Sequence, residues 1–202
     1  MFDLETDVSR ETIARLETFA KVLLKWTAKI NLVSPSTVPD IWNRHIVDSA
    51  QIYPYDPGPH WLDLGSGGGL PGVVCAIIAA EKHPDTKFTL VESDQRKATF
   101  LRTAFRTLAL EHTVLAKRVE DIAGQQASCL TARALKPLPA LLPMAERHLQ
   151  NDGLAIFPKG KTYGDELCEA QQNWHFDVTL KPSMTDENAR IIELRNIRRV
   201  DQ

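Results

Sequence analysis

The sequence predicts an α/β fold with a mostly parallel seven-stranded sheet and an N-terminal helical extension. Two observations predict it. Before about residue 58, apolar residues recur at helical spacing, and from residue 59 onward short apolar runs alternate with helical stretches. The 202 residues, 43% of them hydrophobic and 25% charged, suit one soluble globular domain. We therefore expect an extension at 1–58 packed on a core at 59–202, in one structural domain.

Two helices are predicted in the extension. In residues 9–30, side chains such as Leu16, Phe19 and Leu23 follow the spacing of one helix face. The stretch "NLVSPSTV" ends this helix. A second helix runs from about Val38 to residue 53, with Pro39 in its first turn, where proline is tolerated. The segment "PYDPGPH" then ends the extension.

Strands and helices alternate through the core. The strands are predicted at 60–65, 87–93, 112–118, 128–135, 153–159, 176–182 and 189–197. The helices between them are predicted at 71–84, 95–110, 138–149 and 164–174. The stretch "KPSMTDENAR" has the composition of a loop and not of a crossover helix. We therefore expect the last two strands to form an antiparallel hairpin at the edge of the sheet.

The stretch "DLGSGGGLPG" follows the first predicted strand and holds five of the ten glycines. It fits a dinucleotide fingerprint only out of register. This fingerprint is G-x-G-x-x-G, and its first glycine lies at the turn that ends the strand. If Gly67 is the first glycine, "DLGS" separates the apolar strand from the turn; if Gly65 is the first, the third glycine falls at 69, one residue too early. Asp63 would also repel a phosphate. S-adenosylmethionine, which is cationic and has no phosphate, suits this loop better, although glycines that merely permit a tight turn remain the structural alternative.

An acid ends the second predicted strand, in "TLVES". Glu92 lies where both nucleotide and S-adenosylmethionine sites use a carboxylate to hold ribose hydroxyls. Ligands of open α/β sheets bind at the carboxyl ends of the strands. The glycine loop and Glu92 are therefore expected to share one cofactor site, but Glu92 does not discriminate between the two cofactors.

Charge, cysteines and hydropathy limit the remaining possibilities. The net charge of −2 gives no global attraction to nucleic acid, so such a partner requires a local basic patch. The three cysteines, Cys75, Cys129 and Cys168, have no metal-ligand spacing and read as reduced core residues. No signal peptide or 18-residue apolar run is visible. We expect a cytoplasmic protein that binds no metal.

Two sequence signatures of other methylation reactions are absent, and this limits which kind of atom can accept the methyl group. The Asn/Asp-Pro-Pro-aromatic turn of exocyclic amino methylation is replaced by "ARALKPLP" after the fourth strand, and no cysteine is placed as a nucleophile for pyrimidine carbon-5 methylation. Guanine N7 has an exposed lone pair and no proton to remove, so positioning and desolvation are sufficient. The sequence is compatible with N7 methylation.

Taken in order, "NLVSPSTVPDIWNRHIVDS", "LDLGSGGGLPG", "LVESDQRKATFLR", "VEDIA", "ARAL" and "FPKG" closely resemble the bacterial glucose-inhibited division protein B family. These are 16S rRNA (guanine-N7) methyltransferases with a class I, Rossmann-like fold. The similarity runs from about Thr27 to Gly160 and more loosely to the C-terminus. It implies S-adenosylmethionine as cofactor and, as substrate, a guanine at position 527 of 16S rRNA, within the 30S subunit or a late precursor. A monomer is expected.

The resemblance also implies cofactor contacts. They match Gly65, Leu70, Glu92, Val119, Glu120 and Arg133, and Gly67 belongs to the same glycine loop. The family more commonly has Asp at position 92 and Ser at position 132. From its chemistry alone, a charged side chain ending an apolar strand, like that of Arg133, reads as functional or as half of a structural ion pair.

Cationic side chains provide candidates for contact with RNA. The predicted RNA contacts are Arg44, His45, Lys159, Arg198 and Arg199. The spacing of Arg44, His45 and Asp48 also suits a plain salt-bridge cluster on one helix. Two other functions stay open: an NAD-dependent oxidoreductase, for which no second mononucleotide half is visible, and a non-catalytic nucleotide-binding regulator.

Overall fold

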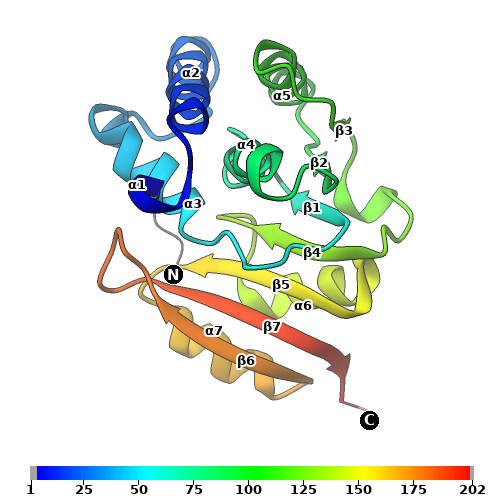
Figure 1. Cartoon of the computed structure of the whole chain (residues 1–202). Coiled ribbons are helices and arrows are strands. Elements are labelled where there is room, and N and C mark those ends of the chain that lie inside the picture. The colour runs from blue at the N-terminus through cyan, green and yellow to red at the C-terminus, as the bar shows by residue number, and fades with distance from the viewer. Residues whose placement is uncertain (1–3, 201–202) are drawn as a thin grey trace.

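The computed structural model describes residues 4–200, which form a seven-stranded sheet in the order β3-β2-β1-β4-β5-β7-β6 (Figure 1). Strands β1 to β5 run parallel, and β7 is antiparallel to both of its neighbours. The predicted mostly parallel sheet is confirmed. The strands are β1 His60–Leu64, β2 Lys87–Val91, β3 Thr113–Leu115, β4 Ala127–Ala132, β5 Leu149–Lys159, β6 Trp174–Pro182 and β7 Arg190–Arg199.

Helices cover both faces of the sheet (Figure 1). Helices α4 (Gly72–Lys82) and α5 (Gln95–Thr107) lie on one face with α2 (Arg10–Thr27), and α6 (Leu138–His148) and α7 (Tyr163–Gln171) lie on the other. The central strands are buried on both sides, as their nearly continuous apolar runs require. No helix within residues 4–200 is long and apolar enough to cross a membrane.

The extension packs on α4 and α5 through its first long helix. Ser9 caps α2, and the buried face of this helix places Leu16, Phe19 and Leu23 in the same hydrophobic core as the residues of α4. At the N-terminus of α2, Glu81 Oε2 accepts hydrogen bonds from Ser9 N at 2.9 Å and from Thr12 Oγ1 at 2.6 Å. The division at residues 1–58 and 59–202 stays a prediction.

The second predicted helix of the extension is not one regular α-helix. It consists of a 3₁₀ segment at Pro35–Asp40, a π-helix at Trp42–Val47 and one short turn, α3, at Asp48–Ala50. The two prolines of the first segment donate no backbone hydrogen bond, which removes support for α-helical pairing there. The π-helix is a rare element that is frequent at functional sites.

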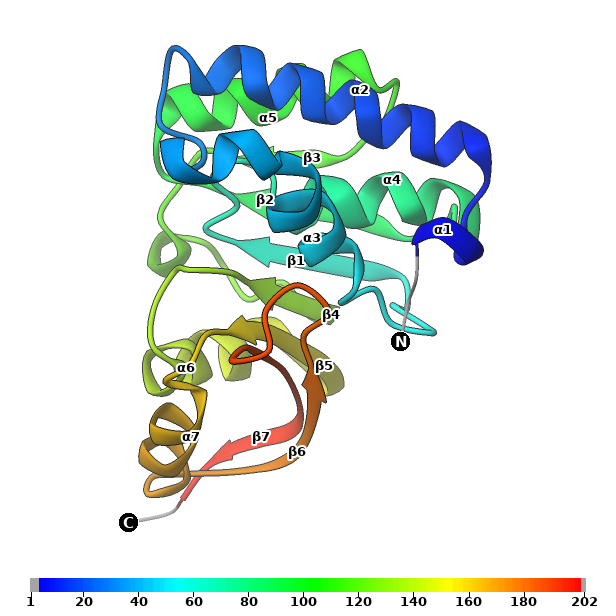
Figure 2. The same ribbon diagram turned by 90° about the vertical axis from the view of Figure 1, so that its left-hand side faces the viewer.

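The last two strands pair as an antiparallel hairpin, as predicted, but β7 lies inside the sheet, between β5 and β6. The register pairs Arg190 with Lys159, so the turn of the hairpin lies at the carboxyl end of β5. Residues 183–189, here called the hairpin loop, reach toward α3 in Figure 2. At this end of the sheet the edge strand is therefore β6 and not β7.

The cysteine prediction is correct at two positions and wrong at one. Cys75 and Cys129 are fully buried, whereas Cys168 is exposed on α7. Helix α7 buries only Ala170, because it covers the outer part of the sheet, near β6. An apolar neighbourhood in sequence therefore does not indicate burial on this helix.

Candidate active site

The glycine loop joins the carboxyl end of β1 to α4. Gly65 has φ +64°, a conformation that L side chains rarely adopt, so the backbone here favours glycine; a Cβ would also stand 2.6 Å from Leu135 Cδ1 and would push that side chain aside. Helix α4 begins at Gly72 with Pro71 as its cap, one residue later than the predicted start at residue 71. The loop thus presents bare backbone at the edge of the sheet where cofactors of this architecture bind.

A buried carboxylate lies beneath this loop. Asp63 Oδ1 accepts a hydrogen bond from Thr131 Oγ1 at 2.7 Å, and Thr131 accepts one from Trp61 Nε1 at 2.9 Å. A Cβ at Gly72 would stand 2.6 Å from Asp63 Oδ2, so the carboxylate faces the first residue of α4. Burial raises the pKa of Asp63 to about 6, although the Thr131 hydrogen bond opposes this rise. The helix N-terminus supports the charged form.

Glu92 ties the end of β2 to the glycine loop. Its Oε2 accepts from Gly67 N at 2.9 Å and its Oε1 from Asp94 N at 2.8 Å. An ionised carboxylate has about four acceptor sites, so these bonds orient Glu92 and leave lone pairs for a ribose diol. The structure therefore brings Glu92 to the loop, as predicted, and its contact with the ribose of S-adenosylmethionine stays a prediction.

The other predicted cofactor residues occupy three different settings. Val119 is buried in a 3₁₀ turn after β3, and Glu120 is exposed there with its carboxylate 3.1 Å from Lys136 Nζ. The Leu70 side chain belongs to the hydrophobic core, so only its backbone can face a ligand. Direct cofactor contact by these residues stays a prediction.

Arg133 makes an ion pair. Its Nη1 lies 2.8 Å from Asp48 Oδ2, and its Nη2 lies 3.2 Å from His45 Nδ1. The structural reading of Arg133 as half of an ion pair is thus what the structure shows, and a cofactor contact stays a prediction. The predicted salt-bridge cluster of Arg44, His45 and Asp48 is only partly correct. Asp48 does form an ion pair, but with Arg133 of the core and not with Arg44.

The proton on His45 is fixed by its neighbours. A guanidinium can only donate, so Nδ1 accepts from Arg133, and Nε2 donates to Thr37 Oγ1 at 2.7 Å. Thr37 in turn donates to Ser34 O at 2.8 Å. Burial, together with the charge of Arg133, lowers the pKa of His45 to about 4. His45 is therefore neutral near pH 7, and its only acceptor atom is occupied.

A cavity of about 710 Å³, here called the polar cavity, opens beside this network. Its volume falls within the range of about 300–1,000 Å³ that small-molecule sites have. It lies at the carboxyl ends of β4 and β5, and the extension and the hairpin loop form its other walls. Among its lining residues are Arg44, His45, Asp48, Gln51, Arg133, Leu135, Lys136, Lys159, Glu166, Thr185, Asp186 and Arg190.

Lys159 lines the polar cavity, but its ammonium group is already engaged. It lies 2.9 Å from Glu166 Oε2 and donates to Lys136 O at 2.7 Å. Glu166 Oε2 also accepts from Leu138 N, the first residue of α6, at 2.7 Å. Lys159 and Glu166 thus fasten the turn that follows β4. Sequence reasoning missed Glu166, because no motif connects an acid on α7 with a helix start 28 residues earlier.

Arg44 is the predicted RNA-contacting residue that the structure leaves available at the polar cavity. It is exposed on the π-helix, and its guanidinium group makes no hydrogen bond or ion pair within residues 4–200. His45, next to it, is buried and committed to Arg133 and Thr37. The structure therefore brings Arg44, His45 and Lys159 to one cavity, with Arg44 alone free to meet a phosphate.

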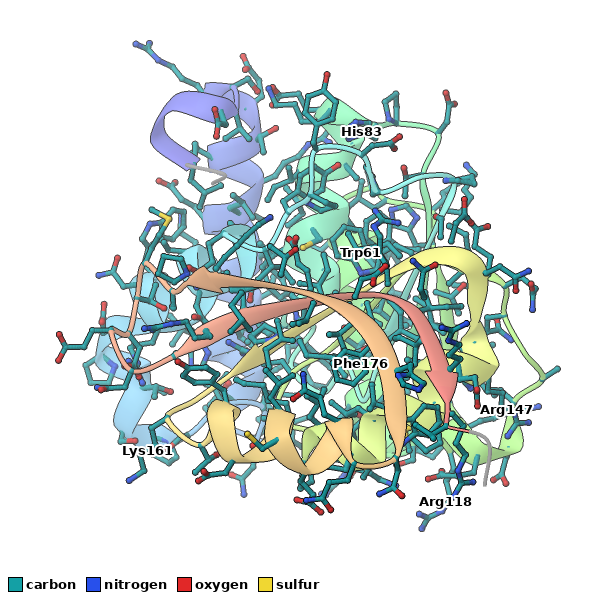
Figure 3. All side chains as sticks on the ribbon, turned by 90° about the horizontal axis from the view of Figure 1, so that it is seen from below. Trp61, His83, Arg118, Arg147, Lys161 and Phe176 are labelled. Carbon is teal, nitrogen blue, oxygen red and sulfur yellow. The ribbon has the colours of Figure 1, made fainter. Side chains whose placement is uncertain are left out.

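Arg198 and Arg199 lie at the other end of the sheet. Arg198 pairs in register with His175, whereas Arg190 pairs with Lys159. Eight residues of straight strand would span about 27 Å, and β7 is curved (Figure 2), so Arg198 lies at most about 27 Å from Arg190, at the other end of the strand. In Figure 3, β7 begins on the side of the molecule where Lys161 lies and ends on the side where Arg118 and Arg147 lie. The predicted RNA contacts therefore lie in two separate places, with Arg44, His45 and Lys159 at the polar cavity and Arg198 and Arg199 at the far end of β7.

Comparison with known proteins agrees with this geometry. The model of the GidB family, described as rRNA small subunit methyltransferase G, matches residues 12–193. The chain belongs to this family. "Ribosomal RNA small subunit methyltransferase G" of Cereibacter sphaeroides is 51% identical over 94% of this chain and 92% of its own length. The protein of the same name from a Ruegeria species is 49% identical over 98% and 97%.

Solved structures show the same fold at low sequence identity. A putative class I S-adenosylmethionine-dependent methyltransferase from Listeria monocytogenes matches with a TM-score of 0.62 at 11% identity, over 96% of this chain and 70% of that one. M. jannaschii TYW2 in complex with AdoMet matches with a TM-score of 0.56 at 10% identity, over 86% and 80%. The GidB-family chain therefore has the class I methyltransferase fold, and the oxidoreductase alternative is not favoured.

Proposed function

We propose that this chain transfers the methyl group of S-adenosylmethionine to N7 of a guanine in 16S rRNA, at position 527 by family resemblance. The observation that carries the proposal is the polar cavity, which adjoins the glycine loop through Leu135. Gly65, Gly67 and Glu92 would hold the cofactor beside it. A base that leaves its stack could enter the cavity, as in other enzymes that modify bases.

S-adenosylmethionine supplies an electrophilic methyl group when it is bound. The residues of the chain then have to orient the base, exclude water and leave N7 facing the donor. No proton leaves N7 during the transfer, so no general base is required. The occupied acceptor atom of His45 agrees with this requirement, since His45 cannot take a proton without losing its bond from Arg133.

The acceptor should be presented by folded RNA. Arg44 lies at the rim of the polar cavity, where it could meet a phosphate, and a net charge of −2 leaves such local contacts to provide the attraction. We propose that the substrate is the 30S subunit or a late precursor, that the enzyme acts as a monomer, and that it acts in the cytoplasm.

Labelled methyl transfer tests this function. The purified protein is incubated with labelled S-adenosylmethionine and either 30S subunits or naked 16S rRNA from a strain that lacks the modification. We expect label in the rRNA of at least one substrate, and reverse-transcription or mass mapping should locate it at N7 of one guanine. Binding of the cofactor without transfer to either substrate, or label at another atom, would overturn the proposal. Stabilisation by NAD in place of S-adenosylmethionine would overturn it as well.

A further inference from the structure

We propose that Asp48 is a positioning residue, which sets the geometry of the polar cavity by holding Arg133 and the hairpin loop at the same time. This inference rests on the proposed function, because it assigns Asp48 a role in placing the RNA acceptor. The Asp48 side chain is only 21% exposed, and its carboxylate is bonded to side chains from other parts of the protein. It would act through the groups that it holds.

Both carboxylate oxygens of Asp48 are used, by three different segments of the chain. Oδ2 accepts from Arg133 Nη1 at 2.8 Å, at the end of β4. Oδ1 accepts from Thr185 Oγ1 at 2.6 Å, on the hairpin loop, and from Gln51 Nε2 at 2.9 Å, just after α3. Asp48 is therefore the point at which the extension, the sheet and the hairpin loop are joined.

Gln51 strengthens the connection to the hairpin loop. Its Oε1 accepts from Met184 N at 2.7 Å, while its Nε2 lies 3.1 Å from Ser183 Oγ. Thus the side-chain amide that Asp48 orients also holds the backbone of the loop. Met184 is 48% exposed, so apolar burial at this residue does not fix the loop. A segment held by a few polar bonds has low local stability, and those bonds decide its position.

Both groups that Asp48 holds form walls of the polar cavity. Arg133 lines it from β4 and leads into the turn of Leu135 and Lys136, and the hairpin loop contributes Thr185 and Asp186. The Arg133 side chain is only 18% exposed, so it has little solvent to replace a lost partner. Loss of the Asp48 charge should therefore displace both walls at once, and displacement of a reacting group by about 1 Å lowers rates about 100-fold.

Asp48→Asn is the first test. The amide keeps the shape of the side chain but presents donors or a weaker acceptor to Arg133. We expect kcat for labelled methyl transfer to 30S subunits to fall by about 10- to 100-fold. The Kd for S-adenosylmethionine, measured by calorimetry, should change less than about threefold, because Asp48 and the polar cavity lie outside the glycine loop. A larger rise in this Kd would show that the variant acts through the predicted cofactor contact of Arg133, and it would overturn the positioning role. In the free protein, amide hydrogen exchange at 183–189 should become faster.

Asp186→Asn is a matched control for charge. It removes one negative charge from the same cavity, and its side chain still accepts from Asn188 N, as Asp186 Oδ1 does at 2.9 Å. Exchange at 183–189 should stay at the wild-type rate. If Asp186→Asn lowers kcat as much as Asp48→Asn does and accelerates exchange equally, cavity charge explains the effect and the proposal fails.

Substitutions of Thr185 test the contact of Asp48 with the hairpin loop separately from its contact with Arg133. Thr185→Val is isosteric but loses the hydroxyl that donates to Asp48 Oδ1, and Thr185→Ser keeps a hydroxyl. We expect Thr185→Val to accelerate amide hydrogen exchange at 183–189 and to lower kcat. Thr185→Ser should leave both close to their wild-type values. Equal behaviour of the two variants would contradict the role of the Asp48 contact.

Failure of this proposal is distinct from failure of the proposed function. Hydrogen exchange is measured on the protein alone and needs no methyl acceptor. If wild-type protein transfers methyl groups but Asp48→Asn changes neither exchange nor kcat, only the positioning role is wrong. If wild-type protein modifies no rRNA, the proposed function and the catalytic part of this inference both fall, whereas the exchange result still decides whether Asp48 holds the loop.

Discussion

Leu135 occupies the space into which any side chain at residue 65 would project, since a Cβ on Gly65 would stand 2.6 Å from Leu135 Cδ1. Gly65 also has φ +64°. This relationship joins the glycine loop to the turn after β4, which lines the polar cavity. The glycine loop and the turn after β4 therefore pack directly beside each other.

Gly65→Ala should destabilise the protein and weaken binding of S-adenosylmethionine. The left-handed backbone costs an L-residue about 1–2 kcal/mol, and contact with Leu135 adds to it. Adding Leu135→Ala should remove the destabilisation that comes from the contact with Leu135, but not the destabilisation that comes from the left-handed backbone. Urea unfolding measures the stability, and calorimetry measures the cofactor affinity. Gly65→Asp should abolish binding.

Gly164→Ala is the control for that pair. A Cβ at Gly164 meets nothing within 4 Å, and the residue lies on α7, where alanine is the better helix former. It should leave cofactor affinity unchanged and raise stability slightly. If Gly65→Ala behaves in the same way, the loop geometry does not require glycine.

Asp63 should give stability a pH dependence of unusual sign for a carboxyl group. Its pKa in the folded state is about 6, raised by burial above the ordinary 3.8. The folded state therefore holds the proton more tightly, so the contribution of Asp63 is greatest below about pH 4 and is lost as the pH rises through 6. The free energy of unfolding of wild type, relative to Asp63→Asn, should fall by about 3 kcal/mol at most between pH 4 and 7. A difference that does not vary with pH would contradict the raised pKa.

Glu81 should have the opposite dependence. Burial raises its pKa, but hydrogen bonds from Thr12 and Ser9 outweigh this and lower it to about 2. The stability from these bonds is present above about pH 4.5 and is lost as the pH falls toward 2. Glu81→Ala should cost about 1 kcal/mol in urea unfolding at pH 7, because the carboxylate is partly exposed. Glu17→Ala, on the exposed face of α2, is the control and should change little.

Replacing Glu166 alone should lower the free energy of unfolding more than replacing both Lys159 and Glu166. Their side chains are only 10% and 19% exposed. Glu166→Gln leaves the ammonium group without its anion and should lower the free energy of unfolding by about 1–3 kcal/mol. Combining Lys159→Met with Glu166→Gln should restore part of that loss. An additive double mutant would show that the two charges do not interact.

Arg198→Ala with Arg199→Ala tests whether RNA extends to the far end of the sheet. If phosphates bind there, the double variant should weaken affinity for 16S rRNA and reduce the slope of log K against log salt by up to about 2. Cofactor affinity should not change, because β7 is antiparallel to β5 and its end lies at the sheet edge opposite to the glycine loop. Arg44→Ala, at the cavity, should reduce the slope by about 1. An unchanged slope would remove the tested arginines from the RNA surface.

Local patterns were sufficient for much of the fold. Alternating apolar runs predict the parallel strands, and the glycine run with Pro71 predicts the strand-to-helix turn, because steric rules of the backbone act over a few residues. The pairing of the last two strands also followed from a loop-like linker. The placement of β7 between β5 and β6, and the division of the second helix into 3₁₀, π and α segments, did not, since they depend on packing between distant elements.

The sequence by itself determined the cofactor loop, the acid at the end of β2 and, through its motifs, the family, since each of these is a short pattern of residue types. Only the tertiary structure decided that Arg133 pairs with Asp48, that Lys159 pairs with Glu166, and that Arg198 lies far from the cavity. A charged side chain shows in sequence that it needs a partner. Which partner it finds is decided by chain segments that meet only after folding.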